Sequence, residues 1–210
     1  MNNKEQVQHF FPSLSEAQQD QLLALEDMYR HWNSMINVVS RKDMDAFFTH
    51  HVLHSLSIAC FVEIHAGWKV LDVGTGGGFP GIPLAIMFPE TEFLLVDSIG
   101  KKIKVVQEIV KAMNLKNVQS ETTRAELVPA GFHLVVSRAV TRMAAFYPWV
   151  KNKVSFNGVN QGIVFLKGGD LHDEIAEFKK QSPMRLVKEY LIHSCIPDPF
   201  FETKKVLTVF

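Results

Sequence analysis

Cysteine is scarce in this 210-residue chain, and long uncharged apolar segments are missing. Cys60 and Cys195 form no C-x-x-C pair and no zinc pattern, so we expect buried free thiols. Because the chain has no run of about 18 apolar residues, the sequence predicts no transmembrane helix. Residues 1–5 lack the basic and apolar parts of a signal peptide, and we therefore expect a cytoplasmic protein.

An excess of either charge is also missing, since 22 Lys and Arg residues balance 22 Asp and Glu residues. The net charge therefore gives no argument for nucleic-acid binding. Apolar residues, in contrast, are plentiful: a hydrophobic content of 47% supports a substantial core. This length and composition predict one large domain, or one domain with an appendage.

The first third of the chain has a helical pattern. Apolar residues recur at helical spacing over residues 13–36, and a capping box begins at Ser13. A second helical stretch starts at Asp43 and ends before Gly67, which would act as a C-cap. We therefore expect an N-terminal helical extension over residues 1–66.

The second helical stretch contains three histidines, His50, His51 and His54, which are spaced over about one helical turn. We expect them on a solvated or capped helix face, because a metal site would also need a supporting acid. The sequence therefore predicts no metal. A pH-sensitive or RNA-facing surface is an alternative for these residues.

From Gly67 onward, apolar strands alternate with helices, which is typical of a parallel α/β sheet. Five parallel strands are expected near residues 68–73, 92–97, 118–120, 132–137 and 163–166. Two closing segments, 185–194 and 204–210, would finish the sheet antiparallel. The sequence predicts a mostly parallel, seven-stranded, Rossmann-like core over residues 67–210.

The densest chemical signal follows the first of these strands, where five glycines fall within the eight residues 74–81. Glycines allow positive φ and let a ligand approach the main chain closely. Free N–H groups at the start of the next helix suit a polar or anionic ligand. We therefore expect Gly74, Gly76 and Gly78 to bind a cofactor.

Two acids narrow the class of cofactor. Asp72 lies inside the first strand, where a carboxylate is costly to bury without a partner, and a ligand amine would supply one. Asp97 ends the second strand about 20 residues beyond Gly76, where an acid can accept hydrogen bonds from a ribose diol. S-adenosylmethionine meets both requirements better than NAD. A structural turn with a surface acid is the alternative.

The ends of the later strands carry further candidates, because open α/β sheets bind ligands beyond the carboxyl ends of their strands. In a methyltransferase, the loop after the third strand generally holds adenine, which assigns Ala125 and Glu126. The end of the fourth strand faces the methyl acceptor, which assigns Arg138. A structural ion pair is the alternative for this arginine.

The fourth strand end also lacks two motifs. It has neither the Pro-Pro-aromatic motif of amine methyltransferases nor the cysteine of enzymes that make 5-methylpyrimidines. Arg138 cannot act as a base at neutral pH. We therefore expect an acceptor that needs no deprotonation, such as N7 of guanine, and catalysis by proximity and alignment.

Together these residues resemble the RsmG (GidB) family, bacterial methyltransferases of guanine N7 in small-subunit ribosomal RNA. The resemblance runs from about Trp32 to Gly168 and rests on Asn37, His51–Leu53, Ser55, Asp72–Leu84, Asp97, Lys101, Lys102, Arg124–Glu126, Ser137–Val140 and Lys167. It implies that the cofactor contacts Gly74, Phe79, Ala125, Glu126 and Arg138, and that the N-terminal helices help to cover the RNA site. The family usually has Arg, Asp and Asp where this chain has His50, His54 and His133.

The sequence thus predicts a cytoplasmic, monomeric class I methyltransferase that uses S-adenosylmethionine to methylate guanine N7 of small-subunit (16S) ribosomal RNA. A methyltransferase of another substrate and a non-catalytic ribosome-assembly factor with a nucleotide pocket are the alternatives. Five lysines are candidates for phosphate contacts, each with a solvated side chain as the alternative: Lys101, Lys102, Lys151, Lys153 and Lys167.

Overall fold

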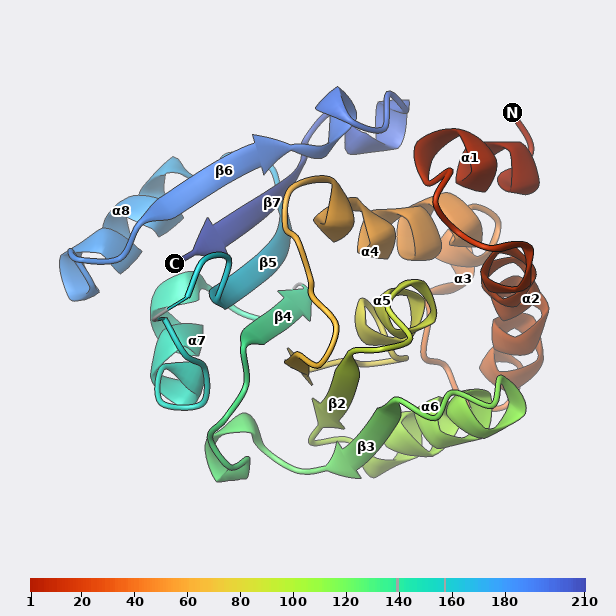
Figure 1. The fold of residues 1–210 in the computed structure, drawn as a ribbon, viewed down its shortest axis with the longest axis horizontal. Coiled ribbons are helices and arrows are strands. Elements are labelled where there is room, and N and C mark those ends of the chain that lie inside the picture. The colour runs from red at the N-terminus through yellow and green to blue at the C-terminus, as the bar shows by residue number, and fades with distance from the viewer. Residues whose placement is uncertain (139, 157) are drawn as a thin grey trace.

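The computed structural model describes residues 1–138, 140–156 and 158–210, with Arg41 and Lys42 described without their side chains. Its centre is a seven-stranded sheet of order β3-β2-β1-β4-β5-β7-β6 (Figure 1). The strands are β1 (Lys69–Val73), β2 (Glu92–Asp97), β3 (Val118–Thr122), β4 (Leu134–Arg138), β5 (Gly162–Gly168), β6 (Val187–Leu191) and β7 (Lys204–Val209). β1 to β5 are parallel, and β7 pairs antiparallel with both β5 and β6. The predicted mostly parallel seven-stranded sheet is confirmed.

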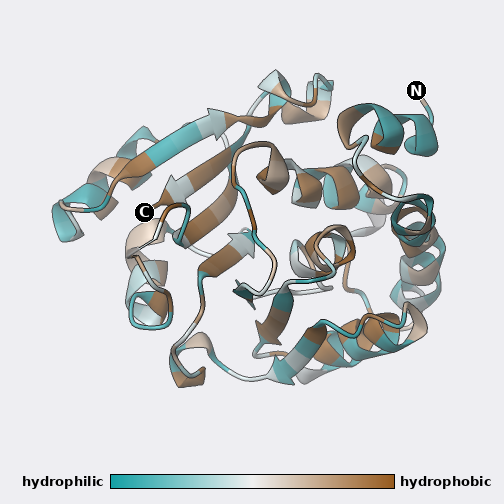
Figure 2. Cartoon of the chain, in the orientation of Figure 1, coloured by the Kyte–Doolittle hydropathy of each residue, from teal (hydrophilic) through white to brown (hydrophobic). Residues whose placement is uncertain are grey.

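Helices cover both faces of the sheet, because successive side chains of a strand point to opposite faces. On one face pack α1 (Asn3–Phe10), α2 (Glu16–Asn33), α4 (His54–Leu56), α5 (Gly81–Met87) and α6 (Gly100–Ala112). On the other face pack α7 (Met143–Val150) and α8 (His172–Gln181). Figure 2 shows hydrophobic colour along the central strands and hydrophilic colour on much of the edge strand β6. Within the described residues, no helix has the length and apolar character needed to span a membrane.

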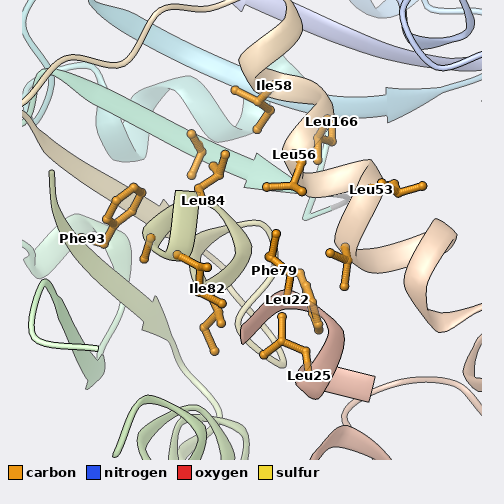
Figure 3. Close-up of a cluster of buried hydrophobic side chains, with 14 of the residues drawn as sticks. Leu22, Leu25, Leu53, Leu56, Ile58, Phe79, Ile82, Leu84, Phe93 and Leu166 are labelled. Atoms are coloured by element: carbon orange, nitrogen blue, oxygen red, sulfur yellow. The ribbon is translucent and has the colours of Figure 1, made fainter. Parts of the chain in front are cut away.

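The N-terminal helices share their apolar cluster with the sheet (Figure 3). Leu22 and Leu25 of α2 and Leu56 of α4 are fully buried in the same cluster as Phe93 of β2 and Leu166 of β5. The helical extension therefore packs on the sheet together with α5, the helix that follows the glycine loop (residues 74–81). A domain boundary near residue 66 stays a prediction.

The boundaries of α2 differ from those expected. Its capping box uses Ser15 and Gln18, not Ser13: Gln18 N donates to Ser15 Oγ (3.3 Å), and Ser15 N donates to Gln18 Oε1 (2.9 Å). The helix ends at Asn33, whose Oδ1 accepts hydrogen bonds from the N–H groups of Val38 and Val39. A side chain that bonds to later backbone groups in this way competes with further helical turns.

The second helical stretch is broken into short pieces and does not reach Gly67. After α3 (Arg41–Met44) the chain forms a π-helix (Phe48–Leu53), then α4, then a 3₁₀ turn (Ser57–Cys60). The remaining short turns are Ala125–Leu127, Ile192–Ser194 and Pro199–Phe201. π-helices are rare and are frequently found at functional sites.

Candidate functional site

A pocket of about 500 Å³ lies at the carboxyl ends of β1, β2, β3 and β4. β1 and β4 are neighbours in the middle of the strand order, with the chain running outward in both directions from them. This topological switch point is the usual ligand site of open α/β sheets. We call this cavity the strand-end pocket. Seven predicted site residues line it: Gly74, Gly76, Phe79, Asp97, Ala125, Glu126 and Arg138.

The glycine loop forms one wall of the strand-end pocket. Gly76 has φ of +59°, and a Cβ at this position would meet no atom within 4 Å. Since Gly76 lines the pocket, its missing side chain leaves the main chain open to a ligand. Gly74 also has positive φ (+68°), and a Cβ there would collide with Val140.

Asp97 fixes this loop from the end of β2. Its Oδ2 accepts a hydrogen bond from Gly76 N (3.0 Å), and its Oδ1 accepts one from Ile99 N (2.9 Å). The residue is 8% exposed and lines the strand-end pocket. Each carboxylate oxygen has a further lone pair, so Asp97 can still accept hydrogen bonds from a diol.

Asp72 lies beneath the glycine loop and outside the pocket lining. Its Oδ2 accepts hydrogen bonds from Thr75 Oγ1 (2.7 Å) and Gly81 N (2.8 Å), so its partners come from its own loop. Complete burial raises the pKa of Asp72 to about 7, a rise that both hydrogen bonds oppose. Gly78 also lies outside the lining. Direct cofactor contact by Asp72 and Gly78 stays a prediction.

The 3₁₀ turn after β3 forms the next part of the wall. Ala125 is buried and Glu126 is exposed, and both line the strand-end pocket. The lining also includes Val38 and Trp149, which the sequence analysis does not identify. Val38 belongs to the loop that Asn33 holds after α2, and Trp149 belongs to α7. Neither position carries a motif that would reveal it.

Arg138 forms the opposite wall, at the end of β4. Its Nη2 lies 2.9 Å from Nδ1 of His51, and its Nη1 donates to the carbonyl of His50 (3.3 Å). The guanidinium carbon lies 5.1 Å from the centre of the Phe79 ring, which is within cation–π range. Within the described residues no carboxylate forms a salt bridge with Arg138. Ala139, which follows in the family-like segment, lies outside the described residues.

Burial lowers the pKa of Arg138 to about 10, against the opposing charge of Asp72. The side chain therefore remains a cation at neutral pH. His51 supports it as a neutral acceptor, because burial and the charge of Arg138 lower the pKa of His51 to about 3. Since Nδ1 accepts from the arginine, the hydrogen of the neutral ring belongs on Nε2.

The histidines are thus not on a solvated face, and that expectation is wrong. His51 and His54 are buried. His50 stacks on Phe200 with ring centres 3.9 Å apart and hydrogen-bonds Asp43 through Nδ1 (2.9 Å). In the π-helix, His51 faces Arg138 at the end of β4 and His50 faces Phe200, while His54 of α4 packs edge-on against Phe200 and Phe201. No group of three potential metal ligands occurs among the described residues.

The five candidate lysines are placed very differently. Lys102 lines the strand-end pocket, and Lys101 is exposed beside it on α6. Lys167 is largely buried, pairs with Glu174 (2.8 Å) and donates to the Thr141 carbonyl (2.5 Å), so it is not a free cation. Lys151 and Lys153 lie near the beginning of β4, where Phe132 N donates to the Lys153 carbonyl. Neither lysine lines the pocket, and Lys153 lies at the amino end of β4, away from the strand ends that form the pocket.

The two cysteines are free thiols, as expected, but they are not buried. Cys60 is exposed and Cys195 is half-buried. The expectation of two buried thiols is wrong because the 3₁₀ turn that ends the helical extension leaves Cys60 at the surface.

The chain is similar to one protein family over most of its length. A family model described as rRNA small subunit methyltransferase G (GidB) matches residues 18–200. The ribosomal RNA small subunit methyltransferase G of Flavobacterium psychrophilum is 52% identical over 208 residues, which cover 98% of this chain and 97% of that protein. The same-named protein of Flavobacterium johnsoniae is 49% identical over 206 residues, covering 97% and 96%.

Solved structures show the same fold. The crystal structure of a SAM dependent methyltransferase from Aquifex aeolicus matches with a TM-score of 0.55 and 13% sequence identity. The match covers 74% of this chain and 88% of that chain. At this identity the likeness concerns the fold alone. The predicted class I methyltransferase fold is thereby confirmed.

Proposed function

The chain belongs to the rRNA small subunit methyltransferase G family, and from this premise we propose that it transfers a methyl group from S-adenosylmethionine to N7 of a guanine in small-subunit ribosomal RNA. One observation carries the proposal. A single pocket has a carboxylate that can bind a ribose, Asp97, on one side and an arginine that is protonated at neutral pH, Arg138, on the other. Family membership makes S-adenosylmethionine the methyl donor.

One side of the pocket, formed by the glycine loop, Asp97 and the turn after β3, fits this cofactor; we call it the glycine side, and the side formed by Arg138 the arginine side. Asp97 has free lone pairs for the two ribose hydroxyls, and Gly76 leaves its main chain open to the pocket. Ala125 and Glu126 form the wall after β3, which we assign to the adenine. A volume of about 500 Å³ is within the usual range for cofactor sites. When bound, S-adenosylmethionine supplies a methyl group on a positively charged sulfur.

The arginine side fits an acceptor that already has a free lone pair. Guanine N7 carries no proton, so no base has to remove one before attack. Among the pocket-lining residues that the structure describes, Arg138 and Val140 lie at the end of β4 and Phe79 lies under the Arg138 guanidinium, and none of the three accepts a proton at neutral pH. Arg138 would orient the acceptor, and the rate gain would come from proximity and in-line alignment.

A methylation assay with chemically altered RNA tests this function. Small-subunit RNA from cells without this gene should be methylated by the purified protein at one guanine, mapped by cleavage at 7-methylguanine. RNA carrying 7-deazaguanine at that position should accept no methyl group, because N7 is replaced by carbon. Methylation of the 7-deaza RNA at the same nucleotide would contradict N7 as the acceptor. Normal cofactor binding without transfer to naked RNA or to the assembled subunit would favour another substrate, and no cofactor binding would favour an assembly factor.

Ribosomal RNA is the partner that family membership implies. We further propose that the protein works as a monomer in the cytoplasm. Light scattering of the purified protein should give the mass of one 23.8 kDa chain. A stable dimer at micromolar concentration would contradict the monomer, and cell fractionation tests the location.

A further inference from the structure

Tyr29 of α2 reaches the glycine loop from behind. It is fully buried, and its hydroxyl donates a hydrogen bond to the carbonyl of Gly77, 48 residues later in the sequence. Gly77 lines the strand-end pocket, whereas Tyr29 does not. The tyrosine therefore contacts a main-chain segment that lines the strand-end pocket, without lining the pocket itself.

Two aromatic neighbours hold the Tyr29 ring in place. Its centre lies 5.1 Å from that of Phe47 and 4.8 Å from that of Phe79, both at tilted angles. Phe79 itself lines the pocket and lies under the guanidinium of Arg138. Since neighbouring rings restrict its side-chain torsions, the hydroxyl is held at one point. Burial raises the pKa of Tyr29 far above its ordinary value, so the hydroxyl remains a donor at every pH of interest.

The tyrosine also fills the space that the glycines leave. A Cβ at Gly77 would lie 3.5 Å from Cε1 of Tyr29, and a Cβ at Gly78 would lie 3.1 Å from its hydroxyl oxygen. The second distance is closer than ordinary contact, so Tyr29 and the glycines fit each other tightly. The loop is therefore held on one side by Asp97, through Gly76, and on the other by Tyr29, through Gly77.

We propose that Tyr29 is a positioning residue for the cofactor: by holding the Gly77 carbonyl, it keeps the glycine loop in the conformation that receives S-adenosylmethionine. The inference rests on the proposed function insofar as it needs the cofactor at this loop. A loop that is ordered before binding costs less free energy to order during binding. Removal of the hydroxyl alone should therefore weaken cofactor binding without removing any group that touches the cofactor.

The test compares Tyr29→Phe with Tyr147→Phe. The second variant is a matched control, because Tyr147 is buried on α7 and its hydroxyl accepts a hydrogen bond from Arg185 (3.1 Å) away from the pocket. Each variant loses one hydroxyl and keeps its ring, so both should fold. Calorimetry gives the Kd for S-adenosylmethionine, thermal melting gives Tm, and steady-state assays on unmethylated RNA give kcat and the KM for each substrate.

We expect Tyr29→Phe to raise the Kd and the cofactor KM by about tenfold while kcat at saturating cofactor stays within about twofold. Tyr147→Phe should lower Tm to a similar extent and leave the cofactor Kd unchanged. Equal Kd values for wild type and Tyr29→Phe would overturn the positioning role, even if Tm falls. A wild-type protein that does not bind the cofactor would instead refute the proposed function, so the two failures are distinguishable.

Discussion

The two sides of the strand-end pocket are formed by different chemical groups. On the glycine side, the wall is main chain and one carboxylate, and Gly76 meets Asp97 only 21 residues further along the chain. On the arginine side, the wall is a cationic side chain whose partner, His51, lies 87 residues earlier. The first side depends on a local strand, turn and helix. The second depends on how the helical extension packs against the sheet.

Buried titratable groups also differ between the two sides. Asp72, under the glycine loop, has its pKa raised by burial, and His51, behind the arginine, has its pKa lowered by burial. Burial favours the neutral form of both groups. Acidification should therefore stabilise the folded chain through Asp72 and destabilise it through His51, and the free energy of unfolding measures both effects.

The largest expected effect concerns the glycine side. In Gly76→Val, a β-branched residue must adopt φ of +59° and its side chain enters the strand-end pocket. We expect the Kd for S-adenosylmethionine, measured by calorimetry, to rise by roughly 1000-fold or more. Gly67→Val is the control, since Gly67 has a similar φ of +76°, open surroundings and no place in the pocket. Ordinary affinity in Gly76→Val would mean that the cofactor does not approach this loop.

The next effect concerns the arginine side. Arg138→Ala removes the cation that orients the acceptor, and we expect kcat/KM with RNA to fall by roughly 100-fold. Tm should change far less than activity, because Arg138 lines the strand-end pocket and forms no salt bridge with a carboxylate among the described residues. Arg142→Ala is the control: it removes an exposed arginine that pairs with Glu177 nearby. Unaltered turnover in Arg138→Ala would exclude this residue from the site.

A third prediction uses pH. Because the pKa of His51 is about 3 in the folded chain and 6.5 in the unfolded chain, protonation below pH 6.5 favours unfolding. Between pH 7 and pH 5, wild type should therefore lose about 2 kcal/mol of unfolding free energy relative to His51→Gln. Denaturant titrations at both pH values measure this. A difference that does not change with pH would contradict a neutral, buried His51.

Asp72 should change the free energy of unfolding in the opposite direction over the same pH range. Its pKa is about 7 in the folded chain against 3.8 in the unfolded chain, so the folded state binds the proton more tightly over that range. Acidification from pH 7 to pH 5 should therefore stabilise wild type relative to Asp72→Asn, again by about 2 kcal/mol. If acidification changed the free energy of unfolding of wild type in the same direction relative to both variants, the two sides of the pocket would not differ in their pH dependence.

The smallest effect concerns the lysines. Lys102 lines the strand-end pocket, whereas Lys151, at the end of α7, lies outside the pocket lining. If Lys102 contacts a phosphate, Lys102→Ala should reduce the salt slope of RNA binding by about 0.7–0.9. Lys151→Ala should leave the slope unchanged. Filter binding over a range of salt concentrations measures both slopes, and identical slopes would remove Lys102 from the RNA contact surface.

The sequence predicts that Gly74, Gly76 and Asp97 lie together because the signals on the glycine side are local, and contact of these residues with the cofactor stays a prediction. A strand, a glycine-rich turn, a helix and a second strand ending in Asp97 follow one another, and parallel pairing then brings the strand ends together. Arg138 is predicted by the same rule, since it ends β4. Chain order and sheet topology suffice for these residues.

The rest depends on contacts between distant segments. Nothing near Tyr29 in the sequence indicates Gly77 as its partner, and nothing near Val38 indicates a pocket. The histidines follow an ordinary helical pattern, so the sequence predicts a solvated face where the structure has a π-helix and buried rings. Such features arise only when the extension packs on the sheet, and pattern alone does not contain them.

The contacts of the helical extension with Arg138 depend on the number of residues in the π-helix Phe48–Leu53. A π-helical turn holds about one residue more than an α-helical turn. Deletion of one residue there would close the turn to α-helical geometry, which moves the residues inside the turn while the flanking turns keep their direction. His51 and the carbonyl of His50 would then no longer meet Arg138. The extra residue of this turn thus determines which side chain and which carbonyl of the extension meet Arg138.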